Sequence, residues 1–521
     1  MKFNLFLLAF PTLLLAQQPD TTQIRFSKYV TAEGMKKNLS VLASDEYEGR
    51  ETGQKGQKMS AEYIKKYYQD LGIKPFSSSQ LKDGYMQAFP LAVFNPQEVK
   101  ISTGKKTFAP NTDYFSWANT IGDTSITLNQ IEFCGYGINT LVYNDFDKLD
   151  VKGKAVMILD GEPTKEGGTS MISQNTEPSV WSSNFRTKQV EAKKQGIKFL
   201  FIVDKNLQAS YAKFEHRITS TRMSIDTKSE PNYPLIIYIS QQMADEIISS
   251  AKNNVAEIAA KTSKSAKPVH FEIKISLTLN ITQKKFGISA ENVMAYIEGS
   301  DLKDEVIVLS AHYDHLGIHD GKVYNGADDD GSGTVAIMQL AKAFQEAKKQ
   351  GKGPRRSMLF LNVSGEEKGL LGSEYYAEHP VLGLDKTVCD LNIDMIGRLD
   401  EEHKTNSNYI YLIGSDKLSK DLHNISEQAN KTYTKLGLDY KYNDENEPNR
   451  YYYRSDHYNF AKNGVPVIFY FNGVHEDYHQ ETDEIGKIDF TKMEKITRLV
   501  FFTAWEIANR TERLKVDSSK K

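Results

Sequence analysis

The stretch VIVLSAHYDHLG, residues 306–317, decides the fold, because a continuous apolar strand runs directly into polar residues. A strand that is apolar on both faces is typical of a parallel sheet covered by helices on each side. After about residue 283, strands of this kind alternate with amphipathic helices, which predicts an α/β fold with a mostly parallel central sheet flanked by helices. The other apolar segments are VMAYIEG, SMLFLNVSGEE, VCDLNIDMIG, YIYLIG and VPVIFYFNG, and helices are expected at 333–349, near 416–432 and near 489–511.

Polar residues follow four of these strands at their carboxyl ends. Ligand sites of open α/β sheets lie outside the carboxyl ends of the strands, so residues far apart in the sequence converge there. Asp329, in the acidic turn NGADDDGSGT that opens a helix, joins the same set. The sequence therefore predicts one shared site that contains His312, Asp314, Glu366, Glu367, Asp394 and His479.

The residue types in this set are those of a hydrolytic metal centre. Imidazole nitrogens and carboxylate oxygens suit zinc and leave a coordination position open for water. If Asp329 bridges two ions about 3.5–4 Å apart, the other four ligands divide evenly between them. His312 and Asp394 then complete one shell, and Glu367 and His479 complete the other. Taken alone, each motif is weak, since an acidic turn is also typical of a calcium loop or a helix cap.

Two further acids receive different roles. Side chains of adjacent residues diverge, so Glu366 is free to act as a general base while Glu367 binds metal. Asp314 lies two positions after His312, on the same side of an extended segment. Its carboxylate is therefore expected to accept the ring N–H of His312 and to fix the tautomer of that ring.

Six motifs together resemble those of the co-catalytic di-zinc exopeptidases, which include secreted zinc aminopeptidases, the glutamate carboxypeptidases and the transferrin receptor. They are AHYDHLG, NGADDDGSGT, SGEEKGLLGS, NIDMIGR, RSDHYNFAKNGVPVIF and YHQETDE. The resemblance covers about 31–75 and 283–511 and implies the same five ligands and the same base. It also implies that Tyr478 donates a hydrogen bond to the tetrahedral intermediate and that Arg454 contacts substrate. Four neighbouring histidines are interpreted as structural or rim residues and left out of the metal set: His315, His319, His457 and His475.

The segment 120–282 differs from the rest in its short strands and turns. The run FCGYGINTLVYNDFDKLDVKGKAVMILDGEP and the αβ unit after it are similar to the protease-associated domain that is often inserted in these enzymes. The alternation from Phe271 to Leu279 predicts a half-exposed strand that closes this smaller β-rich domain. The predicted divisions are a signal peptide at 1–16, the N-terminal part of the peptidase domain at 17–119, the insertion at 120–282, the catalytic domain at 283–514 and a charged tail at 515–521.

The N-terminal stretch MKFNLFLLAFPTLLLA combines one charge, a short apolar run and a final small residue, which is typical of a secretory signal peptide. This run is shorter than the roughly 20 apolar residues of a membrane span, and no other segment comes close to that length. A secreted or periplasmic protein without an integral membrane segment is therefore expected. Cys134 and Cys389 lie in apolar segments and are expected to be buried free thiols. A net charge of −3 over 521 residues leaves no general attraction to nucleic acid.

The sequence thus predicts a secreted aminopeptidase with two zinc ions that acts on peptides with a free N-terminus. A carboxypeptidase or a dipeptidase of the same family stays open, because the sequence does not locate the basic pocket that such an enzyme needs. A glutaminyl cyclase is disfavoured by the inserted domain, and a receptor-like binding module without metals is disfavoured by the complete ligand set. The oligomeric state is not predicted.

Overall fold

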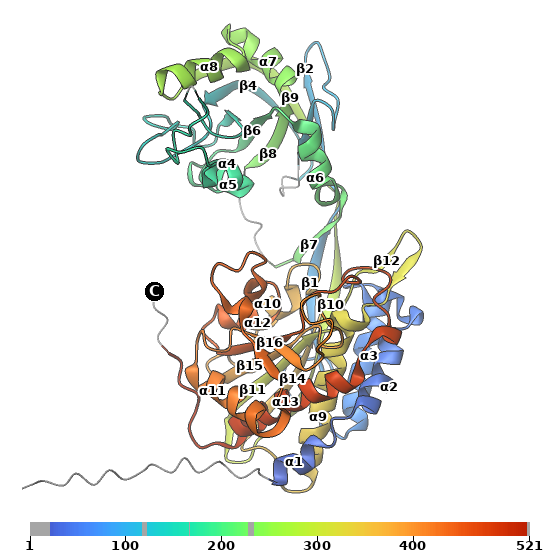
Figure 1. The fold of residues 1–521 in the computed structure, drawn as a ribbon. Helices are drawn as coiled ribbons and strands as arrows, with labels where there is room; N and C mark the ends of the chain where they lie inside the picture. The colour runs from blue at the N-terminus through green and yellow to red at the C-terminus, as the bar shows by residue number, and fades with distance from the viewer. Residues whose placement is uncertain (1–20, 117–121, 166, 228–233, 518–521) are drawn as a thin grey trace, which may run out of the picture. The chain divides into compact units, whose positions relative to one another are not determined.

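The computed structural model describes residues 21–116, 122–165, 167–227 and 234–517 (Figure 1). The predicted signal peptide at 1–16 lies outside these residues. The chain forms two compact units. One contains the residues up to Pro90 together with those from Ser289 onward, and the other contains Leu91–Ile288.

The first unit is built on a sheet whose middle strands are parallel. Strands β14, β11, β15 and β18 are neighbours in that order, and each pairs in parallel with the next. Antiparallel strands flank them, β10 beside β14 and β16 beside β18. The predicted mostly parallel α/β sheet is confirmed. Within the described residues the sheet has nine strands, and seven of them are, in order, β17 (Gly437–Asp439), β16 (Tyr409–Ile413), β18 (Val467–Phe471), β15 (Thr387–Ile393), β11 (Leu302–His312), β14 (Arg356–Val363) and β10 (Lys285–Ile297).

Apolar side chains project from both faces of the middle strands. In β11, Ile307 and Leu309 join the core formed with α2, α3, α9 and α13, whereas Val306 and Val308 join the core formed with α10 and α12. Helices therefore cover both faces, which explains why the apolar residues of these strands do not alternate with polar ones (Figure 1). The main helices of this unit are α1 (Thr21–Ser27), α2 (Ala32–Leu42), α3 (Lys55–Asp70), α9 (Gly333–Lys349), α10 (Leu371–Glu378), α11 (Lys420–Ala429), α12 (His457–Ala461) and α13 (Phe490–Asn509).

Short elements complete this unit. Two helices predicted within 31–75 are confirmed as α2 and α3, and the loop GRETG lies between them. A two-stranded ribbon follows β11. The short elements are β12 (Gly317–His319), β13 (Lys322–Tyr324) and the helical turns η1 (Asp45–Arg50), η3 (Ala327–Ser332), η4 (Asn430–Thr434), η5 (Lys441–Asn443), η6 (Tyr451–Tyr453) and η7 (Ile485–Lys487).

The second unit has its own seven-stranded sheet, with the order β2-β9-β4-β5-β6-β8-β3. It begins at Leu91 rather than at residue 120, because β2 and β3 are strands of this sheet. The predicted closing strand is confirmed as β9, in which Ile273, Leu277 and Leu279 are buried. Its elements are β2 (Glu98–Thr103), β3 (Tyr114–Ser116), β4 (Thr124–Cys134), β5 (Ala155–Leu159), α4 (Val180–Ser183), α5 (Phe185–Lys194), β6 (Phe199–Asp204), α6 (Leu207–Thr219), β7 (Arg222–Ile225), β8 (Leu235–Ser240), α7 (Gln241–Ile248), η2 (Ser249–Ala251), α8 (Val255–Ser265) and β9 (His270–Thr282).

Strand β1 (Met86–Phe94) and strand β10 both cross the boundary between the two units. Residues Leu91–Phe94 of β1 pair with β7 inside the second unit.

Two further predictions concern membrane spans and cysteines. Within the described ranges, no helix is long and apolar enough to span a membrane. Cys134 and Cys389 are both buried and unpaired, as predicted. Burial raises the pKa of the Cys134 thiol to about 12, so this group stays protonated and unreactive at neutral pH.

Candidate metal centre

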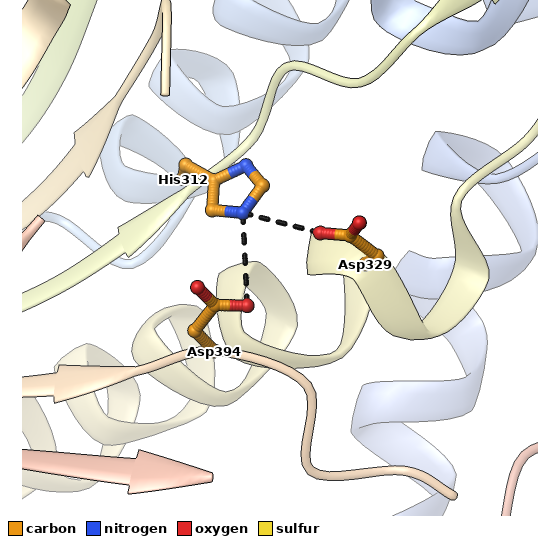
Figure 2. A group of neighbouring side chains, drawn as sticks. All are labelled: His312, Asp329 and Asp394. Atoms are coloured by element: carbon orange, nitrogen blue, oxygen red, sulfur yellow. Dashed lines mark ion pairs between the residues drawn. The ribbon is translucent and has the colours of Figure 1, made fainter. Parts of the chain in front are cut away.

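Three of the predicted ligands meet at the carboxyl edge of the central sheet. Nε2 of His312, the last residue of β11, lies 3.3 Å from Oδ1 of Asp329 and 3.7 Å from Oδ1 of Asp394 (Figure 2). Asp394 directly follows β15, and Asp329 lies in the turn that precedes α9. The parallel neighbours β11 and β15 thus deliver their ligands to one point, as the strand-end argument predicted.

The second oxygen of Asp329 faces a different pair of ligands. Its Oδ2 lies 3.1 Å from Nε2 of His479, and that nitrogen lies 3.3 Å from Oε2 of Glu367. Glu367 follows β14 and His479 follows β18. Asp329 therefore presents one oxygen to each group, which is the arrangement that a bridging carboxylate requires.

The turn that carries Asp329 is held by two buried carboxylates. Asp483 accepts the backbone N–H groups of Asp328 and Asp329 at 3.0 and 3.1 Å. Oδ1 of Asp330 accepts the N–H of Gly333 at 2.8 Å and that of Met395, the residue after Asp394, at 3.1 Å. The sequence analysis did not single out Asp483, although it lies in the same motif as His479.

Asp394 is oriented from behind by Ser455. The Ser455 hydroxyl donates to Oδ2 of Asp394 at 2.7 Å and accepts a hydrogen bond from Nδ2 of Asn392 at 2.9 Å. These hydrogen bonds engage Oδ2 of Asp394 and leave Oδ1 facing His312.

Asp314 differs from its expected role. The ring Nδ1 of His312 is 3.1 Å from the backbone carbonyl of Asp314, whereas the nearer carboxylate oxygen is 3.8 Å away. That carboxylate instead accepts the Thr52 hydroxyl at 2.6 Å and the N–H of Glu366 at 3.3 Å. The main chain of Asp314 thus orients His312, because its side chain is engaged in holding the loop of the predicted base.

Glu366 lies next to the ligands without joining either close group. Its Oε2 is 4.0 Å from Nε2 of His312, and its side chain is 12% exposed. Burial raises the pKa of Glu366 well above its usual value, and the neighbouring His312 offsets this only in part. A carboxyl group with a raised pKa is suited to take up a proton near neutral pH.

The pKa of Asp329, at the bridging position, is shifted in the opposite direction from that of Glu366. Burial alone would raise the pKa of Asp329, but hydrogen bonds with His312 and His479 outweigh it and hold that pKa well below the ordinary value. Burial would likewise lower the pKa of His479, but its contacts with Asp329 and Glu367 raise it to about 10. Asp329 is therefore an anion that attracts positive charge from both sides.

Arg50, from the GRETG loop, is a buried residue that the sequence analysis missed. Its side chain is 1% exposed and donates to four backbone carbonyls. These bonds tie the end of α2 to the segments that follow His312 and precede Asp329. The acceptors are Tyr313 O at 2.7 Å, Leu42 O at 2.8 Å, Asn325 O at 2.6 Å and Gly326 O at 2.9 Å.

We expect Arg50→Ala to lower the free energy of unfolding by about 3–5 kcal/mol, because it leaves buried carbonyls without a donor. Urea unfolding followed by circular dichroism measures the change. Lys55→Ala is the control, since Lys55 is 70% exposed and pairs with Glu48 at the surface. Equal losses in the two variants would contradict a structural role for Arg50.

A small pocket opens beside the ligands. Half of its lining residues are apolar or aromatic and the other half are four of the ligands, Glu366 and Arg454, which is the one cationic side chain other than histidine among them. Nη2 of Arg454 lies 3.4 Å from the Tyr478 hydroxyl oxygen, and its guanidinium lies 5.1 Å from the ring of Tyr451. The remaining wall consists of Met395, Phe469, Phe471 and Val474.

The donor set fits zinc. Imidazole nitrogens and carboxylate oxygens are ordinary zinc ligands, and both close groups combine them. Oε1 of Glu367 is buried without a hydrogen-bond partner among the described residues, as expected of an atom reserved for a cation.

Comparison with known proteins agrees with this site. Residues 292–504 match the model of Peptidase family M28, which confirms the resemblance inferred from the motifs over this range. A probable zinc metalloprotease of Pyrenophora tritici-repentis is 27% identical over 265 residues, which cover 43% of this chain and 52% of that relative. A probable leucine aminopeptidase of Arthroderma otae is 29% identical over 227 residues, which cover 42% of this chain and 57% of that relative. The chain thus spans little more than half the length of these two curated relatives.

The likeness to a solved structure extends beyond residues 292–504. The solved structure of an aminopeptidase from Aneurinibacillus sp. strain AM-1 aligns with a TM-score of 0.54 over 95% of this chain and 98% of that one, at 18% identity. At this identity the likeness shows the fold alone.

Proposed function

Because residues 292–504 match Peptidase family M28, we propose that this protein is a zinc-dependent aminopeptidase that removes residues from the N-termini of peptides. The observation that carries the proposal is the convergence of four ligands on a fifth, Asp329, with Glu366 lining the same pocket as four of the five. A binding module has no use for a carboxyl group of raised pKa next to a metal-ligand set. The relatives described as zinc metalloprotease and leucine aminopeptidase support the same reading.

The residues of the pocket take separate roles in peptide hydrolysis. Two zinc ions, when bound, would lower the pKa of a water molecule and polarise the substrate carbonyl. Glu366 accepts the proton of the attacking water and returns it to the departing amine. The Tyr478 hydroxyl donates a hydrogen bond to the oxygen on which negative charge develops. His312, Asp394, Glu367, His479 and Asp329 would hold the ions.

A carboxypeptidase is the second candidate, and Arg454 is the observation that favours it. Its guanidinium lines the same pocket as Glu366 and is suited to bind a terminal carboxylate. The matched relatives include a probable leucine aminopeptidase, which favours the aminopeptidase.

Mass spectrometry of matched peptides decides between these candidates. One peptide is offered to the zinc-loaded protein with a free N-terminus, with an acetylated N-terminus and with an amidated C-terminus. We expect stepwise loss of N-terminal residues from the free and the amidated forms, and an intact acetylated form. Loss of residues from the C-terminus that amidation blocks would assign a carboxypeptidase, and formation of pyroglutamate would assign a cyclase.

Tyr478→Phe tests the role of the hydroxyl. We expect kcat to fall by about 10²–10³, the usual cost of one oxyanion donor, while KM changes little. Steady-state kinetics on an N-terminal amino-acid p-nitroanilide measures both constants. Tyr453→Phe is the control, because Tyr453 is 44% exposed. A rise in KM with unchanged kcat would instead place Tyr478 in ground-state binding.

Two further proposals concern the context of the enzyme. Residues 1–16 act as a secretory signal, so the mature protein works outside the cytoplasm. Leu91–Ile288 are a protease-associated domain, a reading supported by the motif similarity of that segment. Expression of the whole chain, followed by N-terminal sequencing of exported protein, tests the first proposal, and a start at Met1 would contradict it.

A further inference from the structure

His315 is a buried residue that the five-ligand assignment leaves without a role. It lies three residues after His312 in the loop that follows β11, and it is 0% exposed. Neither ring nitrogen has a hydrogen-bond partner among the described residues. An imidazole buried with both nitrogens unsatisfied is costly, so a missing partner is expected there.

The surroundings of the ring indicate which kind of partner is missing. Nδ1 of His315 lies 3.0 Å from Oε1 of Glu367 and 3.8 Å from Oδ2 of Asp329. His315 Nδ1 and Glu367 Oε1 are close but do not have the geometry of a hydrogen bond, and neither atom has another partner within the described parts of the chain. Two electron-rich atoms at this distance point to a cation between them.

The spacing fits one zinc ion. Two donors that each lie about 2.0–2.1 Å from zinc, at the tetrahedral angle, are about 3.3–3.4 Å apart. The Glu367 contact of His315, at 3.0 Å, compares with 3.1 and 3.3 Å for the two contacts of His479 in the same group. The rings of His315 and His479 approach the group from different directions, with centroids 6.0 Å apart and an angle of 68° between their planes.

The backbone fixes the position of the His315 ring. The N–H of His315 donates to the carbonyl of Arg50 at 3.3 Å, and residues Glu51 and His315 form an isolated β-bridge. On the other side, a Cβ at Gly326 would lie 2.4 Å from Cγ of His315, so only glycine leaves room for the ring. The ring is thus held in place before any ion binds.

We propose that His315 is a direct ligand of the second zinc ion, together with Glu367, His479 and Asp329. This assignment rests on the proposed function and adds one ligand to its metal set. The second position then has four protein ligands, the number found in closed structural zinc sites. The first position keeps three, from His312, Asp394 and Asp329, the number that leaves a position open for water and substrate. The second ion is therefore bound more tightly than the first.

Zinc-loaded protein tests this assignment without an activity assay. X-ray absorption at the zinc edge counts histidine ligands per ion in the unmodified chain. If His315 binds, three imidazoles, those of His312, His315 and His479, are shared by two ions. If it does not bind, two imidazoles are shared by two ions, and the assignment is overturned.

The variant His315→Ala supplies the second readout. Zinc retained per chain is measured by plasma mass spectrometry after dialysis against chelators of graded strength. We expect affinity at the second position to fall by more than about 100-fold, because loss of a residue that only hydrogen-bonds to a ligand costs about 10–100-fold. His457→Ala is the matched control, since His457 is equally buried but stacks on Phe469 and forms no ion pair with a ligand among the described residues, and we expect it to keep both ions.

The outcomes separate this assignment from the proposed function. A smaller loss in His315→Ala, or an equal loss in His457→Ala, overturns the role of His315 as a ligand and leaves the five-ligand centre intact. Failure of the unmodified chain to retain zinc contradicts the proposed function itself. If His315→Ala does not fold, the absorption measurement on the unmodified chain still decides the question.

Discussion

Replacement of Glu366 by Gln is expected to lower kcat by about 10³–10⁴ while the protein keeps its zinc. The amide has nearly the same shape as the carboxylate but cannot accept the proton of the attacking water. Because Glu366 stands apart from the close ligand groups, its replacement removes no ligand. Steady-state kinetics on a peptide substrate and zinc analysis of the same sample measure the two effects.

Glu367→Gln is the matched comparison, because it makes the same change one residue later. Oε2 of Glu367 lies 3.3 Å from Nε2 of His479, within the second ligand group. We therefore expect Glu367→Gln to lose zinc as well as activity. If Glu366→Gln also loses zinc, or retains more than a tenth of wild-type kcat, Glu366 is not the base.

Asp329→Asn is expected to have the second large effect, because it weakens zinc binding at both positions. The two oxygens of Asp329 face different histidines, Oδ1 toward His312 and Oδ2 toward His479. An amide keeps one oxygen and replaces the other with a nitrogen that does not bind metal. We expect zinc affinity to fall by more than about 100-fold at each position, beyond the cost of an outer-sphere change, and cleavage to fall to background.

Asp328→Asn is the control for this variant, since Asp328 is adjacent and 0% exposed. Its Oδ1 accepts the N–H of Gly397 at 2.6 Å, which an amide oxygen also does. Zinc analysis after dialysis should find two ions in Asp328→Asn and less than one in Asp329→Asn. Similar zinc loss in the two variants would mean that the acidic turn, and not the bridging carboxylate, determines binding.

The central sheet could be predicted from the sequence because the burial of each strand on both faces is visible in the residues of that strand. β14, β15 and β18 are buried at every position and β11 is buried over its last seven residues, mostly with apolar side chains, and a predicted site residue lies at or after the end of each strand. The strand order is not written in any one segment, yet the rule for carboxyl ends brought the ligands together without it. The number and chemistry of the five ligands then predicted their division between two ions, and the resemblance to known motifs implied the same set.

The residues that position the ligands could not be predicted from the sequence in this way. Arg50 and Ser455 act on groups far away in the sequence, through contacts that exist only in the folded chain. A histidine beside a site is usually structural, and His315 is singled out only by its unpartnered nitrogens together with the 3.0 Å approach of one of them to Oε1 of Glu367. The start of the second unit at Leu91 depends on strand pairing by β2 and β3, which periodicity alone does not reveal.

Titration of zinc into metal-free protein, with occupancy and peptide cleavage followed in the same samples, tests the central claim most directly. The account predicts that the chain takes up two zinc ions and that cleavage of a free N-terminal peptide reaches its maximum only when the second equivalent is bound. Full activity at one equivalent, or no specific uptake of zinc, would contradict a two-ion centre bridged by Asp329.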